Sequence, residues 1–176
     1  MLQKDNRYRV LEQFFFFPLT QLQLRELSRK AKLAPPSVKR YLLEFEKEGL
    51  IVREKHRLHG FPVYRANRES ETFLMLKKLD TIKRISESGL LDYLYTTCMP
   101  DVILFFGSAS IGEDIESSDI DLFLQCDPEE LHLERYEKLL FRRVSPFFQK
   151  DFGKLSKELK NNLVNGIVLK GYLKPF

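Results

Sequence analysis

The hydrophobic positions of the first 67 residues predict three helices. Apolar side chains recur every three or four residues in three successive segments, which places them on one face of a helix. The first segment, Arg7 to Phe17, is rich in phenylalanine and ends at Pro18. A second helix is expected to start with a capping box of Thr20 and Gln23. A third is expected to have Pro36 at its first helical position.

Two strand-like segments follow the third helix, which Gly49 closes. Residues Ile51–Lys55 and Phe61–Ala66 flank a basic tip at residues 55–60, as the two strands of a β-hairpin do. We therefore expect residues 1–67 to form one domain of three helices and a hairpin.

Residues 68–98 are expected to be helices that link this domain to a second one. Apolar residues recur at helical spacing from Phe73 to Ile85, Ser88-Gly89 interrupts the pattern, and Leu90 to Tyr95 resumes it. The longer helix could pack within the chain or against a second copy. We expect a homodimer.

Residues 99–176 mix short apolar runs with helical patterns. Strands are expected at 102–106, 120–124, 147–148 and 166–171, and helices at 129–142 and 154–165. The whole chain is therefore expected to be α+β.

Length and composition fit two small domains. The chain has 176 residues, of which 43% are hydrophobic, enough to bury two cores. No apolar stretch approaches the roughly 18 to 20 residues that span a membrane, and the first residues lack the apolar run of a signal peptide. We expect a cytoplasmic protein without a membrane partner. Cys98 and Cys126 are expected to be buried free thiols, and the histidines show no ligand pattern.

Charge is distributed unevenly along the chain. Residues 1–67 carry 14 Lys and Arg against 7 Asp and Glu, a net charge of +7. The remaining residues carry 15 against 18, a net charge of −3, and the two parts sum to the total of +4. The first domain is therefore the candidate for nucleic-acid contact.

A glycine-serine turn and a pair of carboxylates lie close together in the second domain. The apolar run Val102–Phe106 ends abruptly at Gly107-Ser108, and the next apolar run opens on Asp119 and Asp121. Side chains two residues apart on a strand point to the same side, so the two carboxylates are expected to stand together.

This arrangement favours a divalent cation and a nucleotide. Two carboxylates about 5 Å apart repel each other by roughly 3 kcal/mol at an effective dielectric of about 20. A cation between them removes that cost, and carboxylates with phosphate oxygens are the usual ligands of Mg²⁺. The glycine lets a backbone approach closely, and the serine adds a hydroxyl at a helix start. The sequence indicates a site for Mg²⁺ or Mn²⁺ and an NTP.

The segment from Gly107 to Asp121 resembles the nucleotidyltransferase signature of the DNA polymerase beta superfamily. The pattern is Gly-Ser, three residues, Gly, and then Ser-Asp-Ile-Asp-Leu, and the likeness to small prokaryotic minimal nucleotidyltransferases extends over residues 90–173. It implies an α/β domain with a mixed sheet over residues 99–176. It also implies that Asp119 and Asp121 are the catalytic metal ligands. The implied nucleotide-binding residues are Gly107, Ser108, Gly112 and Ser118.

Two positions depart from the family pattern. Ile111 stands where many relatives carry an arginine, and Ser145 falls where relatives supply a third carboxylate. Asp151 could replace that carboxylate only through a strand shift of six residues. Two functions stay open: a transferase acting on an unknown acceptor, a protein included, and a DNA-binding transcriptional regulator. In the second, the transferase-like domain is degenerate and serves nucleotide sensing or dimerisation.

Residues 1–67 resemble the winged helix-turn-helix of prokaryotic transcription regulators. The likeness is carried by residues 24–27, 35–42 and 48–51. It implies that the third helix meets base edges in the major groove and that the hairpin, or wing, meets phosphates or the minor groove. The alternative is a winged helix used only for protein contacts. The implied DNA-binding residues are Ser37, Lys39, Arg40, Arg53, Lys55 and Arg57, with Arg65 as a further wing residue.

Overall fold

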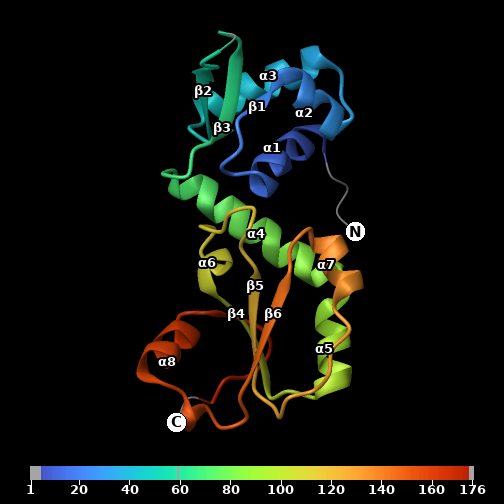
Figure 1. Ribbon diagram of the computed structural model, residues 1–176, viewed down its shortest axis with the longest axis vertical. Coiled ribbons are helices and arrows are strands. Elements are labelled where there is room, and N and C mark those ends of the chain that lie inside the picture. The colour runs from blue at the N-terminus through green and yellow to red at the C-terminus, as the bar shows by residue number, and fades with distance from the viewer. Residues whose placement is uncertain (1–4, 59, 175–176) are drawn as a thin grey trace. The chain divides into compact units, whose positions relative to one another are not determined.

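The computed structural model of the protein describes residues 5–58 and 60–174 and has a mixed α+β architecture (Figure 1). This confirms the expected class. Contacts divide the chain into two compact units, with the division between Lys77 and Lys78 inside helix α4 (Glu71–Glu87). The sequence placed boundaries after residues 67 and 98, and those domain limits stay predictions.

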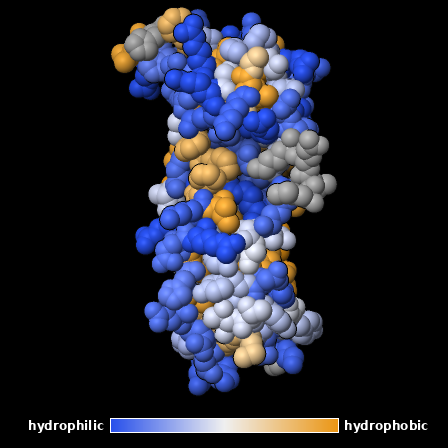
Figure 2. All heavy atoms as spheres, turned by 90° about the vertical axis from the view of Figure 1, so that its right-hand side faces the viewer, coloured by the Kyte–Doolittle hydropathy of each residue, from blue (hydrophilic) through white to orange (hydrophobic). Residues whose placement is uncertain are grey.

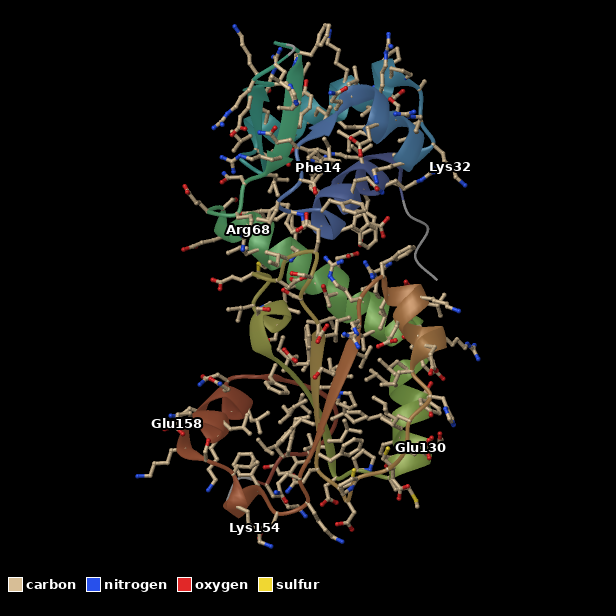
Figure 3. The ribbon with its side chains drawn as sticks, viewed as in Figure 1. Phe14, Lys32, Arg68, Glu130, Lys154 and Glu158 are labelled. Carbon is tan, nitrogen blue, oxygen red and sulfur yellow. The ribbon has the colours of Figure 1, made fainter. Side chains whose placement is uncertain are left out.

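The N-terminal unit packs three helices on a small antiparallel sheet. Its strand order is β1-β3-β2. Phe14 points into the core, and Leu27, Leu42 and Phe45 are also fully buried (Figure 3). The elements are α1 (Asn6–Phe16), β1 (Leu22–Gln23), α2 (Leu24–Ala31), α3 (Pro35–Lys47), β2 (Ile51–Lys55) and β3 (Pro62–Ala66).

The predicted capping box of α2 is wrong. Residues Leu22 and Gln23 pair with β3, so Gln23 is extended and gives α2 no side-chain cap. Residues that the sequence pattern assigned to the first turn of the helix instead form a strand paired with β3. The third helix begins at Pro35, one residue earlier than expected, with both prolines in its first turn.

The C-terminal unit is built on a four-stranded mixed sheet of order β6-β5-β4-β7. Strands β5 and β6 are parallel and the other pairs are antiparallel, which confirms the expected mixed sheet. The elements are α5 (Leu90–Cys98), β4 (Val102–Phe106), α6 (Gly107–Ser110), β5 (Ile120–Leu124), α7 (Glu134–Leu140), β6 (Val144–Phe148), the 3-10 helix η1 (Phe152–Lys154), α8 (Lys157–Val164) and β7 (Ile167–Gly171).

The two faces of this sheet bury different sets of side chains. One face of β5, with Leu122, belongs to the cluster that contains Leu94 of α5 and Leu140 of α7. The other face, with Phe123, packs with Phe152 of η1 and Leu163 of α8. Because side chains alternate along a strand, Asp121 lies on the same face as Phe123.

Several expected elements of this unit differ in length from the observed ones. The helix expected at 129–142 runs only from Glu134 to Leu140, and the backbone N–H of His132 before it donates to the hydroxyl of Tyr93 at 2.9 Å. The strand expected at 147–148 begins at Val144, because it pairs with β5 over five residues. The helix expected from residue 154 begins at Lys157, where Ser156 caps it.

The surface in Figure 2 is mainly hydrophilic, and its hydrophobic side chains form separate small patches. Within the part of the chain that the structure describes, we find no helix with the length and apolar character needed to cross a bilayer. Cys98 and Cys126 are buried free thiols, as expected, and burial raises the pKa of the Cys126 thiol to about 11.

Candidate functional site

The ends of three neighbouring strands bring the predicted site residues together at one end of the C-terminal sheet. Phe106, the last residue of β4, pairs with Asp121 of β5, and Asp121 pairs with Ser145 of β6. Gly107 directly follows β4, and Asp119 directly precedes β5. The fold therefore places the glycine-serine turn and both carboxylates side by side at this end.

Gly107 is packed directly against the carboxylate of Asp121. Its backbone has φ +73°, a left-handed conformation that side chains rarely adopt. A Cβ atom at this position would lie 2.2 Å from Oδ2 of Asp121. A glycine is therefore required here both by the turn and by the carboxylate that lies on it.

The two aspartates interact electrostatically. The pKa of the Asp121 carboxyl is raised, first because partial burial penalises its charged form and then because the Asp119 charge repels it. A cation bound between the two carboxylates would remove this repulsion. The sequence predicted the pairing, and the geometry brings the two carboxylates together.

Removing the charge of Asp121 is expected to stabilise the metal-free protein. Its native pKa lies above that of the unfolded chain, so stability falls as pH rises from the unfolded pKa through the native pKa. Asp121→Asn should then raise the free energy of unfolding at neutral pH by about 0.5 kcal/mol, the size typical of a partly exposed charge pair. The gain should vanish below the unfolded pKa. Urea unfolding across pH measures both effects, and a loss of stability at neutral pH would contradict the account.

The remaining predicted nucleotide-binding residues shape the loop between α6 and β5. Ser108 is exposed in the first turn of α6, whereas Gly112 is buried with φ +83°. The hydroxyl of Ser118 accepts a hydrogen bond from the N–H of Ile115 at 2.9 Å, so it braces this loop. The side chain of Ile111 is half exposed on α6's C-terminal side.

Ser145, which the sequence comparison matched to a third carboxylate of the resembled family, lies beside Asp121 in the sheet. It pairs in register with Asp121, on the same face of the sheet. Asp151 lies beyond the other end of β6, where its carboxylate accepts from the N–H of Gly153 at 2.9 Å. Figure 3 shows the neighbouring Lys154 at the end of the sheet opposite the start of β5. The observed register therefore excludes Asp151 from the site.

Asp119 and Asp121 supply only part of the ligand set of a divalent cation. Across residues 5–58 and 60–174, no group of three or more His, Cys, Asp or Glu side chains converges as a metal site. Mg²⁺ is commonly held by one or two carboxylates together with substrate phosphates and water. Asp119 and Asp121 suit that mode, in which a nucleotide completes the ligand set.

An open hollow of about 540 Å³ adjoins Asp119 on the β6 side of β5. Its lining includes Lys138, Phe141 and Arg143, none of which the sequence pattern had singled out. Phe141 has φ 54° and an exposed ring, an unusual combination for a residue that ends a helix. No periodicity or motif marks these residues, because α7 and the start of β6 come together only in the folded unit.

The predicted DNA-binding residues lie on α3 and on the hairpin of β2 and β3. The side chains of Lys39 and Arg40 are exposed, and Ser37 is partly buried in the first turn of α3. Arg53, Lys55 and Arg57 are exposed along the hairpin.

Acidic side chains near this surface have partners within the same unit. Glu44 and Glu48 of α3 accept hydrogen bonds from Arg7 of α1. Arg65 donates to Glu54 at 2.6 Å, so its charge is neutralised in place. The hairpin's positive charge therefore rests on residues other than Arg65.

Comparisons with known protein families, with curated proteins and with solved structures find no match for this chain.

Proposed function

We propose that the chain is a metal-dependent nucleotidyltransferase joined to a DNA-binding winged helix. The C-terminal unit would move a nucleoside monophosphate from an NTP to an acceptor hydroxyl: the hydroxyl loses its proton and bonds to the α-phosphorus, the α–β phosphate bond breaks, and pyrophosphate leaves. The observation that supports it best is the close packing of the Asp121 carboxylate on Gly107, with Asp119 beside it at the same end of the sheet.

Each residue of the site has a role in this proposal. The exposed Gly107 and Ser108 would admit the phosphates at the start of α6, where the N-cap residue Phe106 makes no side-chain hydrogen bond to the helix. Gly112 and Ser118 fix the loop that carries Asp119. Asp119 and Asp121 would hold Mg²⁺ or Mn²⁺ and so orient the reacting phosphate. The metal, when bound, would neutralise charge on the phosphates and lower the pKa of the attacking hydroxyl.

Ser145 shapes the expected behaviour of this site. It adds an oxygen beside Asp121 but no negative charge. With two carboxylates, metal binding should depend on the phosphates of the nucleotide. Transfer of label from an α-labelled NTP to a nucleic-acid or protein acceptor tests the proposal, and it should be absent from the Asp119→Asn/Asp121→Asn variant.

The DNA-binding part of the proposal rests on the N-terminal unit. Its net charge is positive, and exposed cations lie on α3 and on the hairpin. The arrangement of three helices and a hairpin suits α3 for the major groove and the hairpin for the adjacent backbone. A homodimer would present two such units to a symmetric site.

Replacing Lys39 and Arg40 with alanine is expected to weaken DNA binding strongly. Each phosphate contact that is lost should lower the slope of log K against log salt by about 0.9, so the double variant should lose up to about 1.8. Fluorescence anisotropy across a salt series measures the slope. The matched control is Lys154→Ala/Lys157→Ala, two exposed lysines of the C-terminal unit. Equal affinities and equal slopes for the α3 variant and the wild type would refute the contact.

The second candidate function is a transcriptional regulator whose transferase-like unit senses a nucleotide or serves dimerisation. Ser145 beside Asp121 favours it, because a serine cannot replace the charge of a carboxylate. This candidate predicts metal-dependent NTP binding without transfer to any acceptor. The two functions are separated by measuring binding and transfer on the same preparation.

A further inference from the structure

A second hollow, of about 480 Å³, lies on the N-terminal unit between α3 and the strands of the hairpin. Arg25, Lys39 and Arg53 border it, and none of the described residues in its lining is acidic. All three basic side chains are exposed. The rim of the hollow therefore carries positive charge alone.

Two large apolar side chains border the same hollow. The side chain of Leu43 is 50% exposed and that of Phe61 is 67% exposed. Leucine and phenylalanine are among the residue types that are most often buried. Single exposed apolar residues are common on protein surfaces, but these two, one on α3 and one just before β3, border the same hollow. Leu43 lies one helical turn after Lys39, so both point from the same face of α3.

We propose that this hollow reads thymine methyl groups in the major groove, with Leu43 and Phe61 making the apolar contacts. The inference rests on the proposed DNA binding and adds a sequence preference to it. The 5-methyl group of thymine is the apolar feature of the major-groove base edges, and apolar side chains are its usual partners.

The charges around the hollow support duplex DNA as its occupant. Arg25, Lys39 and Arg53 come from α2, α3 and β2, so they surround the apolar pair on several sides. Phosphates flank every base edge in the groove, and cations placed in this way would hold the backbone while the apolar pair meets the bases. An acidic protein segment would match the charges but gives no reason for a methyl-sized apolar contact.

The test begins with the full chain and a pool of random duplexes, from which bound sequences are selected. Selected sites should contain thymine at defined positions. Each of these thymines is then replaced by uracil, which lacks the methyl group, and dissociation constants are measured at one salt concentration. The wild type should lose about fourfold in affinity for each methyl group that it buries.

Leu43→Ala is the decisive variant, with Phe61→Ala as a second. At the affected position, Leu43→Ala should bind the thymine and uracil duplexes equally, and a separate salt series should give it the wild-type slope. Leu139→Ala, which truncates a half-exposed leucine of α7, should keep the wild-type discrimination. Leu43 is half exposed, so its truncation should leave the fold intact.

Different results would contradict the thymine contact and DNA binding by the N-terminal unit. Sequence-specific binding with no effect of uracil, or with discrimination kept in both variants, would overturn the methyl contact and leave DNA binding standing. Selected sites without thymine would do the same. Failure to bind duplex DNA at any salt would overturn both, and would point to an acidic protein segment as the occupant.

Discussion

Asparagine at both Asp119 and Asp121 is expected to reduce metal-dependent transfer by at least about a thousandfold. Metal ligation of a reacting phosphate stabilises the transition state by several kcal/mol, and each 1.36 kcal/mol is about tenfold in rate. The double variant keeps the size and polarity of both side chains while removing both charges. Transfer from an α-labelled NTP at saturating Mg²⁺ measures the loss.

The matched control for this variant is Asp151→Asn. Asp151 is an exposed carboxylate of the same unit, but it lies beyond the opposite end of β6 and caps η1. Its replacement should leave transfer unchanged. Equal activity in the wild type and in Asp119→Asn/Asp121→Asn would remove the carboxylate pair from the reaction.

The second large effect is expected from Gly107→Ala. The new Cβ atom would lie 2.2 Å from Oδ2 of Asp121, so the carboxylate must move. An alanine in the left-handed conformation lowers the free energy of unfolding by about 1 to 2 kcal/mol. The shifts that remove the clash with the carboxylate lower it by about 1 to 3 kcal/mol more. We expect this total loss in the free energy of unfolding, together with at least tenfold weaker binding of NTP with Mg²⁺.

Gly89→Ala separates the two causes. Gly89 belongs to the same unit and has φ +79°, but apart from its two chain neighbours no atom of the described residues lies within 4 Å of the position of its Cβ. Its replacement should show only the backbone cost and leave nucleotide binding intact. If the two alanine variants lose the same stability and both bind the nucleotide normally, the packing of Asp121 on Gly107 has no functional role.

Much of the fold follows from local patterns in the sequence. The strands Val102–Phe106 and Ile120–Leu124 were predicted with their observed bounds, because each is a continuous apolar run between turn residues. By contrast, β1 exists through its pairing with β3, and the first residues of β6 through their pairing with β5. Contacts between distant segments decide such elements, and local patterns do not report them.

The candidate sites divide in the same way. Asp119, Asp121 and Gly107 could be identified because their spacing along the chain is set by one strand and one turn. The hollow beside Asp119 and the hollow at Leu43 each combine side chains from separate elements. Phe141, Leu43 and Phe61 in these linings belong to no motif, so they can be identified only in the folded units.

Ser145 shows what a register adds to a motif. The sequence suggested that a serine stands in place of a carboxylate, with Asp151 as a distant substitute. The parallel pairing of β5 and β6 puts Ser145 beside Asp121 and leaves Asp151 at the other end. Activity therefore depends on whether the two carboxylates and the phosphates of the nucleotide can jointly bind the metal.

The proposed function requires that the C-terminal unit bind a metal and a nucleotide together. Calorimetric titration of the wild-type protein with NTPs, in the presence and absence of Mg²⁺ or Mn²⁺, measures this binding. We predict saturable binding that requires both the metal and the nucleotide and that is lost in Asp119→Asn/Asp121→Asn. Absence of binding in the wild type, or binding that is the same without metal, would contradict the account.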